Sequence, residues 1–437
     1  MRMTACKKRD LRRLGGICLL SAMLSACSGG SGGAEIEGGE IRNAEIGATA
    51  VTDCSVASIN RWVDAEMRDT YIYYNEVPFL NLDEYTDPSM LVRDLRVSPD
   101  IYSSVVDQAR DEEIISNSSV TRFGFWLQQA SDGRQHFASI SGNSPMENAG
   151  IQRGDELIAI NSVAIDEISD DQWREFVVGD LDEELTAVFT VRSGTSAPAD
   201  FTVTKTTYTE STVPNYGTYE QTSNAVGYMQ VTAFRGTTTE EIDTAVQSLA
   251  EAGISELILD LRYNGGGFTS VARQLASQIA GTAFVGEVYS RRVFNDKYSD
   301  FNRDFFIEPQ TLNLDLSRLI VLTTPATASA SETLANGLAP LIDVVVIGSR
   351  TEGKPFTSVA QDFCGKRINA MSTITTNGVN ESVLGGMVPT CEVRDDFLAP
   401  TDSTSDALTG AAFNFIQSGA CPAAVQSSLQ QEDLRRG

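Results

Sequence analysis

Ser329 and Lys354 are the residues whose types and surroundings could together do hydrolytic chemistry. Ser329 lies in the segment Thr-Ala-Ser-Ala-Ser-Glu (327–332), and Lys354 lies in Thr-Glu-Gly-Lys (351–354). A serine hydrolase must remove the proton of its hydroxyl group, usually with a histidine. The chain contains one histidine, His136, which is distant in sequence. A lysine held neutral is the obvious remaining base, so the pair indicates a Ser-Lys hydrolase.

The segments around this pair alternate between strand and helix patterns, which is typical of an α/β sheet. Residues 284–315 are polar and aromatic, and we expect a hairpin or a cap there. The expected strands are 227–234, 256–261, 318–323 and 343–347, and the expected helices are 239–252, 271–280 and 330–341.

Functional groups of such a sheet gather at the carboxyl ends of its strands. The Gly265-Gly266-Gly267 triplet, Ser329 and Lys354 each follow a different expected strand, and a right-handed crossover would place serine and lysine along one edge. Glycine tolerates positive φ, so a backbone N–H of the triplet could form an oxyanion hole with the N–H of Ala330.

Each part of this constellation also has a purely structural interpretation. Ser329 and Glu332 fit a helix capping box, and Gly353-Lys354 fits an ordinary turn with a solvated lysine. Either segment alone favours that interpretation. Their combination on neighbouring strand ends, without a histidine, favours catalysis.

A second unit, expected from about residue 119 to 208, resembles a PDZ domain of the bacterial protease type. The resemblance rests on residues 144–161, where a short helix, a Gly-Asp turn and an apolar strand follow one another. Arg122-Phe123-Gly124-Phe125 occupies the position of the carboxylate-binding loop, whose backbone N–H groups would capture a chain terminus. A PDZ shape that covers the active site without binding peptides is the alternative. His136 is expected on a solvated turn of this unit.

Three segments look like the carboxyl-terminal processing (tail-specific) serine proteases, namely 260–267, 327–332 and 348–354. The order of leader, helical region, PDZ unit and catalytic unit matches that family as well. The resemblance implies a crotonase/ClpP-like α/β catalytic fold with Ser329 as nucleophile and Lys354 as general base. It also implies an oxyanion hole formed by Ala330 N–H and one glycine N–H, assigned to Gly266. We expect no cofactor, and no cysteine/histidine spacing suggests a metal.

The chain departs from the family pattern at two places. Pro355 and Ser358 stand where the family often has glycine and glutamine, and Asn264 is followed by glycine in place of proline. That glutamine supports the lysine in some members, so the resemblance implies that another residue takes this task. The candidates are Ser358, Gln361 and Glu332.

The N-terminus resembles a bacterial lipoprotein leader. Basic residues between Arg2 and Arg13 precede the apolar stretch 17–24, and Leu-Ser-Ala-Cys then ends at Cys27, the expected lipidation site. The stretch is too short to span a bilayer. Ser28 after the cysteine favours the outer membrane in this resemblance, so we expect a lipid-anchored protein on the periplasmic side of the envelope. An ordinary signal peptide with a chance cysteine is the alternative.

Length, charge and composition limit the number of domains and the kinds of partner that this chain can have. At 437 residues the chain suggests two or three domains, and a formal net charge of −26 disfavours binding to nucleic acid or anionic lipid. Ile59, Trp62, Val63, Met67 and Tyr71 recur at helical spacing and are expected in a core. The expected division is signal peptide 1–26, tether 27–50, helical region 51–115, PDZ-like domain 116–208, catalytic domain 209–425 and polar tail 426–437, the last without a role.

Four cysteines remain after the leader and the lipid site, an even number that suits an oxidising compartment. We expect Cys364–Cys391, which closes a short loop, and Cys54–Cys421, which joins the ends. Four buried free thiols are the alternative.

These patterns predict a serine endopeptidase that cleaves proteins recognised by their C-terminal tails through the PDZ unit. The alternative from another class is a non-catalytic PDZ-containing adaptor protein on the same fold. Crotonase-type acyl-CoA chemistry suits the fold, but it fits neither the compartment nor the PDZ unit. The oligomeric state is not indicated.

Overall fold

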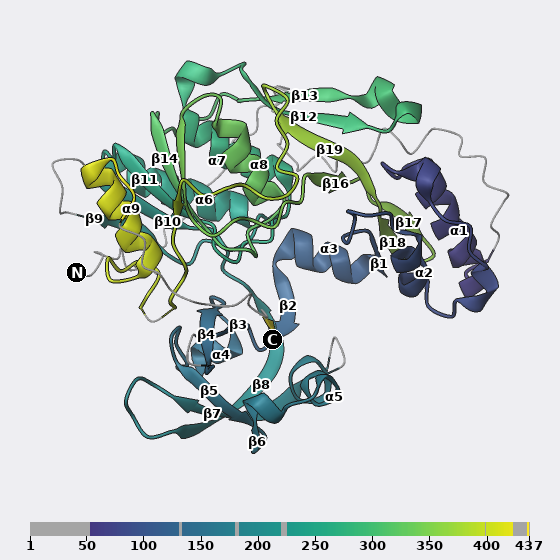
Figure 1. Ribbon diagram of the computed structural model, residues 1–437, viewed down its shortest axis with the longest axis horizontal. Coiled ribbons are helices and arrows are strands. Elements are labelled where there is room, and N and C mark those ends of the chain that lie inside the picture. The colour runs from purple at the N-terminus through teal and green to yellow at the C-terminus, as the bar shows by residue number, and fades with distance from the viewer. Residues whose placement is uncertain are drawn as a thin grey trace, which may run out of the picture.

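The computed structural model describes residues 53–130, 133–179, 183–219, 225–397, 399–422 and 435–436. Figure 1 shows a PDZ-like unit below a larger α/β unit, with the N-terminal helices at one side. The expected signal peptide, the tether and Cys27 lie outside the described residues.

A six-stranded sheet of order β20-β15-β14-β11-β10-β9 is the middle layer of the α/β unit. Its strands from β10 to β20 are parallel, and β9 is antiparallel. The strands are β9 (Tyr216–Tyr219), β10 (Val226–Gln230), β11 (Glu256–Asp260), β14 (Arg318–Thr323), β15 (Asp343–Gly348) and β20 (Cys391–Glu392).

Helices cover both faces of this sheet because alternate strand residues point to opposite sides. Leu257 and Leu259 pack with α6 (Thr238–Glu251), α7 (Thr269–Ala280) and α8 (Ala330–Leu338), whereas Ile258 packs with α9 (Ala407–Ser418). The expected α/β architecture is confirmed. Two expected elements are too long: the strand from 227 ends at Gln230, and the helix from 330 ends at Leu338.

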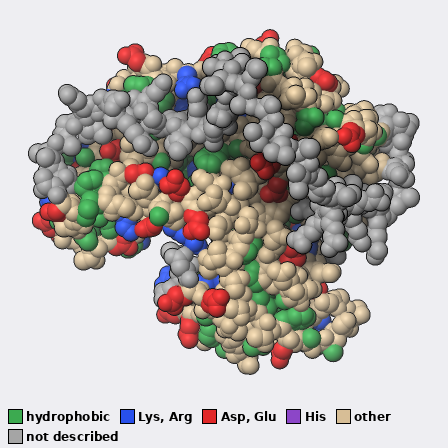
Figure 2. All heavy atoms as spheres, turned by 180° about the vertical axis from the view of Figure 1, so that it is seen from behind, with side chains coloured by type: hydrophobic (Ala, Val, Ile, Leu, Met, Phe, Trp, Pro, Cys, Tyr) green, Lys and Arg blue, Asp and Glu red, His purple; other side chains and the backbone are tan. Residues whose placement is uncertain are grey.

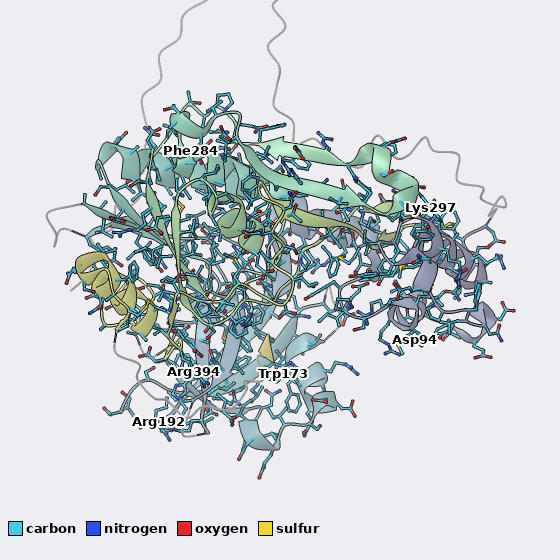
Figure 3. All side chains as sticks on the ribbon, turned by 45° about the horizontal axis from the view of Figure 1, so that its top comes forward. Asp94, Trp173, Arg192, Phe284, Lys297 and Arg394 are labelled. Carbon is cyan, nitrogen blue, oxygen red and sulfur yellow. A yellow bond between two sulfur atoms is a disulfide. The ribbon has the colours of Figure 1, made fainter. Side chains whose placement is uncertain are left out.

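The segment 284–315 forms the expected hairpin. Its strands β12 (Val288–Phe294) and β13 (Arg303–Phe306) join β19 (Met371–Asn377) and β16 (Phe356–Ser358) in a four-stranded sheet. Short 3-10 helices flank β12 at Thr282–Phe284 and Asp296–Phe301. Lys297 of the second one lies beside the N-terminal helices (Figure 3), and its Nζ donates to Arg68 O at 2.8 Å.

The N-terminal region packs onto the α/β unit through one apolar core. Ile59, Val63 and Met67 on one face of the first helix contact a cluster that includes Ile368 and Met371. The helical spacing of these residues is therefore confirmed as a core pattern. The elements are α1 (Val56–Asp69), Tyr74–Glu76, Leu82–Glu84, α2 (Pro88–Leu95) and β1 (Ser104–Asp107), with β1 pairing with β18 (Lys366–Asn369) next to β17 (Gln361–Phe363).

The PDZ-like unit is a sheet of order β2-β8-β7-β5-β4-β3-β21, entered through α3 (Gln108–Asn117). Its core includes Phe123, Phe125, Phe137 and Phe189. The elements are β2 (Ser119–Arg122), β3 (Phe125–Gln129), β4 (Gln135–Ile140), α4 (Pro145–Asn148), β5 (Glu156–Ile160), β6 (Val163–Ala164), Ile165–Glu167, α5 (Asp170–Trp173) with a π-helical turn Arg174–Val178, β7 (Leu185–Arg192), β8 (Ala199–Thr209) and β21 (Arg435–Arg436).

His136 does not lie on a solvated turn, so that expectation is wrong. It stands in β4, is 7 % exposed, and its Nδ1 lies 2.9 Å from Gly154 O. Its ring also lies 5.6 Å from the ring of Phe397. The strand β4 begins at Gln135, so it already includes the histidine.

The disulfides join Cys54 to Cys364 and Cys391 to Cys421, so the expected pairing is wrong. Cys364 follows β17, which packs against the N-terminal helices and so meets the residue just before α1. Cys391 lies in β20, and Cys421 follows the helix α9 that covers the same sheet. Spacing alone favoured the shortest loop, but strand order decides which cysteines meet.

Loss of the Cys54–Cys364 bridge is expected to lower stability by about 3 to 5 kcal/mol, since the bridge closes a 310-residue separation in the unfolded chain. Peptide mapping under non-reducing conditions should recover both bridges. Thermal unfolding of a Cys54→Ser/Cys364→Ser variant should then occur at a lower temperature than that of the parent. An unchanged midpoint would contradict the expected contribution.

Acidic side chains are scattered over the face shown in Figure 2, and lysine and arginine form no continuous patch there. In the described part of the chain, none of the helices has both the length and the apolar character required to cross a bilayer.

Candidate active site

Ser329 lies between the end of β14 and the first residue of α8. Its backbone has φ 58° and ψ −115°, which differs from the extended backbone of an ordinary N-cap residue. Positive φ is uncommon outside glycine, and such strain is concentrated at functional sites. The segment before it is fixed because Thr327 Oγ1 donates to Leu261 O at 2.8 Å and Ala328 N–H donates to Asn264 O at 3.0 Å. The serine is therefore attached to the residues that follow β11.

Gly266 brings its backbone against the nucleophile. A Cβ at this position would lie 2.8 Å from Ser329 Cβ and 2.9 Å from Ala330 N, and φ is 102°. No larger residue fits there, as the glycine triplet predicted. The N–H of Gly266 donates to Asn264 Oδ1 at 2.9 Å in this arrangement.

Ala330 is the first residue of α8, so its N–H stands at the positive end of the helix dipole. An anion formed at Ser329 would lie beside this end. The structure therefore brings together three of the expected site residues, Ser329, Ala330 and Gly266.

Lys354 follows β15 and lies over an aromatic ring. Its Nζ is 4.9 Å from the centre of the Tyr102 ring. Burial lowers the pKa of Lys354 below its usual 10.5, although the carboxylates of Asp100, Glu332 and Glu352 act in the opposite direction. Sequence reasoning missed Tyr102 and Asp100, since they belong to the N-terminal region and no motif marks them.

Glu332 connects the two halves of the site. Its carboxylate accepts from the N–H of Ser329 at 2.8 Å, of Gly353 at 2.7 Å and of Lys354 at 2.9 Å, and from the hydroxyl of Thr351. Desolvation raises the pKa of Glu332 despite these bonds. A fully buried carboxylate thus holds the loops of both Ser329 and Lys354.

Glu332 is also the residue, among the three candidates for supporting the lysine, that bonds to Lys354. Ser358 lies in β16 opposite Met371, and Gln361 lies in β17 opposite Ile368. Within the described residues, neither of them bonds to Lys354, and no hydrogen bond joins Ser329 Oγ to Lys354 Nζ.

The expected carboxylate-binding loop lies between β2 and β3. Arg122 forms an ion pair with Glu210, and the side chains of Phe123 and Phe125 are buried in the core of the unit. Gly124 has φ 91°, and a Cβ there would lie 2.3 Å from Ser144 Cβ. The loop therefore depends on glycine, and it presents backbone because its aromatic side chains are turned inward.

Contacts from β3 reach the segment that precedes the glycine triplet. The ring of Trp126 stacks on Tyr263 with centroids 6.1 Å apart, and Tyr263 Oη donates to Gln128 Oε1 at 2.9 Å. Tyr263 Oη also donates to Asp395 at 2.7 Å. The PDZ-like unit is thus in direct contact with the residue before Asn264.

A buried ion cluster joins the same two units. Arg262 bonds to Asp260 at 2.9 Å, to Asp406 at 2.9 Å and to Asp395 at 3.2 Å. Arg153 of the PDZ-like unit pairs with Asp395 and Asp406 as well. The two guanidinium groups hold the pKa of the Asp395 carboxyl well below its usual range. These aspartates are therefore neutralised by arginine.

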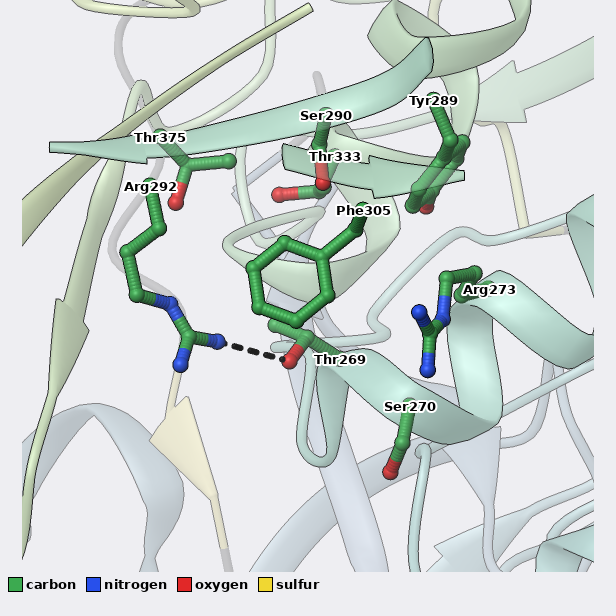
Figure 4. A pocket seen from close by; sticks show the side chains of 9 residues that line it. All are labelled: Thr269, Ser270, Arg273, Tyr289, Ser290, Arg292, Phe305, Thr333 and Thr375. Atoms are coloured by element: carbon green, nitrogen blue, oxygen red, sulfur yellow. Dashed lines mark hydrogen bonds between the residues drawn. The ribbon is translucent and has the colours of Figure 1, made fainter. Parts of the chain in front are cut away.

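A small pocket lies beside α8, one turn beyond Ser329 (Figure 4). Arg292 points into it and donates to Thr269 Oγ1 at 3.3 Å, and Arg273 faces it from α7. Thr333 of α8 contributes to its wall. The pocket is polar and cationic, and neither Ser329 nor Lys354 lines it. The other lining residues are Ser270, Tyr289, Ser290, Phe305 and Thr375.

Comparison with known proteins gives three adjoining matches to family models. Residues 58–104 match the peptidase S41 N-terminal domain, residues 113–183 match the PDZ domain, and residues 225–379 match peptidase family S41.

Similar proteins support the same class. The carboxyl-terminal-processing protease of Synechocystis is 27% identical over 211 residues, which are 48% of this chain and 47% of that protein. The carboxy-terminal processing protease CtpA of Bacillus subtilis is 25% identical over 265 residues, 60% of this chain and 54% of that protein. These matches span about half the length of the relatives. A crystal structure from Bacteroides fragilis classed with the S41 proteases has a TM-score of 0.67 at 23% identity, covering 82% of this chain and 97% of its own, and shows the fold.

The fold and its matches define a peptidase-type α/β domain preceded by a PDZ domain. Residues 225–379 match peptidase family S41, and the chain is similar to carboxyl-terminal processing proteases.

Proposed function

We propose that this chain is a serine endopeptidase with Ser329 as nucleophile and Lys354 as general base. The observation that carries the proposal is the double attachment of Glu332, which binds the backbone of both residues from one buried carboxylate. A strained serine at a helix N-terminus and a lysine with a lowered pKa suit the two roles.

In the proposed mechanism, neutral Lys354 takes the hydroxyl proton while Ser329 Oγ attacks the scissile carbonyl carbon. The N–H of Ala330 and a glycine N–H of the triplet stabilise the oxyanion. Lys354 then gives its proton to the leaving amine, and water hydrolyses the acyl-enzyme by the reverse steps.

Two local changes separate the observed arrangement from a reactive one. Lys354 Nζ must form a bond to Ser329 Oγ that the described residues do not show, and the N–H of Gly266 must leave Asn264 Oδ1 if this glycine is the second donor. Both changes are rotations about flexible bonds, and catalytic contacts in proteins without substrate are often longer than in the reacting complex.

Proteolysis of an unfolded model protein tests the proposal. Ser329→Ala and Lys354→Ala should each lower the rate by at least about 10³-fold, since the nucleophile and its base act as one unit. Circular dichroism of each variant controls for folding. Equal cleavage by the parent and both folded variants would contradict the proposal.

We further propose that substrates are proteins recognised by their C-terminal tails at β3, and that the protein is lipid-anchored through Cys27 on the periplasmic side, at the outer membrane. The Gly124 loop supports tail recognition, and two disulfides suit an oxidising compartment. Nucleic acid is not expected as a partner, given the net charge of −26. Labelling of cells with a radioactive fatty acid, with Cys27→Ser as control, tests the anchor.

A non-catalytic adaptor is the second candidate, because the Ser329 and Lys354 side chains are not bonded to each other within the described residues. It predicts tail-peptide binding by the folded protein without cleavage. Single-turnover measurement of an acyl adduct on Ser329 separates the two candidates.

The pH dependence of cleavage should follow Lys354. The neutral lysine is the active form, so kcat/KM should rise with pH and level off above an apparent pKa below 10.5.

A lowered lysine pKa also means that the charged form destabilises the fold, and this cost disappears as pH rises through the folded and then the unfolded pKa. Lys354→Met should therefore be inactive but melt no lower than the parent at neutral pH. A kcat/KM that does not depend on pH, or that rises only around the usual lysine pKa of 10.5, would contradict this expectation.

A further inference from the structure

The last residues of the chain form a strand at the edge of the PDZ sheet. β21 pairs antiparallel with β3, with Arg435 opposite Leu127 and Arg436 opposite Trp126. Without β21, β3 would be the edge strand of this sheet. Figure 1 marks the C-terminus beside β2 and β8 in this unit. An edge strand offers backbone groups that pair with an extended peptide, so the tail uses the surface on which a PDZ ligand would lie.

The direction of this pairing is that of a C-terminal ligand. Partner numbers fall along β3 as this antiparallel strand advances, from Leu127 opposite Arg435 to Trp126 opposite Arg436. The strand therefore runs towards Phe125 and the Gly124 loop. Such loops capture a terminal carboxylate with backbone N–H groups.

We propose that the segment around Arg435 and Arg436 is an internal ligand of the PDZ domain and competes there with substrate tails. The competition rests on the proposed function, because it assumes that substrates use the same edge. The occupancy itself rests on the observed pairing alone.

The stretch of sequence between Pro422 and Arg435 is long enough to allow this occupancy within one molecule. Cys421 is fixed to Cys391 by a disulfide, and Arg435 follows Pro422 by thirteen residues. A segment of that length reaches up to about 45 Å when extended. A ligand joined to its site by a short stretch of the same chain has an effective concentration of about millimolar. A weak ligand would thus occupy the edge most of the time.

The sequence of the tail makes it displaceable. Its residues 435–437 are Arg-Arg-Gly, none of which offers an apolar side chain for a pocket. Backbone pairing supplies affinity in this binding mode, whereas side chains supply selectivity. A substrate tail with an apolar last residue would gain contacts that the internal tail lacks. A substrate tail must therefore bind the β3 edge tightly enough to displace the internal tail.

The occupied strand is also the one that touches the catalytic unit. Trp126 pairs with the tail and stacks on Tyr263, and Gln128 accepts from Tyr263 Oη. Tyr263 precedes Asn264, whose Oδ1 holds the N–H of Gly266. Release of the tail would therefore alter the strand that contacts Tyr263, and Tyr263 precedes the residue that binds Gly266.

Binding of a labelled peptide with the sequence of residues 430–437 tests the inference. The measurement compares the full chain with a chain that ends at Leu429, both with Ser329→Ala so that no peptide is cut. The shortened chain should bind the peptide at least about tenfold more tightly, because its edge is vacant. Amide hydrogen exchange in residues 125–129 should also be faster in the shortened chain without peptide.

A matched control keeps the length of the chain and changes only the pairing. Arg435→Pro with Arg436→Pro removes backbone N–H groups from this short strand, so the variant should bind the peptide like the shortened chain. Equal affinity of the full and shortened chains, or binding by neither, would overturn the inference. A difference that grows with protein concentration would assign the tail to a second copy and overturn it as well. Proteolysis by the protein that keeps Ser329 is measured separately. An absence of cleavage would contradict the proposed function but would leave these binding results unchanged.

Discussion

Arg262→Met is expected to lower the free energy of unfolding by about 3 to 5 kcal/mol, the largest stability loss we anticipate for a single substitution. Arg262 is 1 % exposed and bonds to three buried carboxylates, those of Asp260, Asp395 and Asp406. Methionine fills much of the volume but leaves these charges without their central cation. Arg153 would still pair with Asp395 and Asp406, so Asp260 would be affected most.

Thermal unfolding measures this effect, with Arg192→Met as the matched control. Arg192 pairs with Glu156 at 2.7 Å in the PDZ-like unit, but a third of its side chain is exposed. An exposed pair contributes at most about 1 kcal/mol, so the control should melt close to the parent. Equal melting of both variants would contradict a structural role for the cluster.

The α/β layer could be predicted from sequence because its pattern is local. Segments such as 256–261 and 318–323 are apolar throughout and end at turn signals, which is typical of strands covered on both faces. The parallel order then placed Ser329 and Lys354 at neighbouring strand ends. Gly266 was assigned through the family resemblance, and its close approach to Ser329 explains why a glycine stands there.

The contacts that sequence reasoning missed all join distant segments. Tyr102 meets Lys354 because β1 pairs with β18, a pairing that no local pattern encodes. The disulfides follow the same rule, since Cys54 meets Cys364 through packing between the N-terminal helices and β17. The tail pairing of β21 was missed because two residues carry no strand signal.

Glu332→Gln is expected to lower kcat by about 10²-fold or more while the fold is kept. Each carboxylate oxygen of Glu332 accepts from two donors, one oxygen from Ser329 and Lys354 N–H and the other from Thr351 and Gly353. Glutamine has nearly the same shape but turns an NH₂ group towards one of these donor pairs. Two lost charge-assisted bonds cost about 3 kcal/mol, and about 1.4 kcal/mol corresponds to a tenfold change in rate.

The effect should fall on kcat and leave KM nearly unchanged, because Glu332 positions the nucleophile and the base and is too buried to meet substrate. Glu251→Gln on the exposed end of α6 is the control and should behave like the parent. If Glu332 served only the fold, heating would reveal a lower midpoint while kcat at low temperature stayed near that of the parent. A loss of kcat at a temperature where the variant is still folded would instead mean that the serine and the lysine are held in place through one carboxylate.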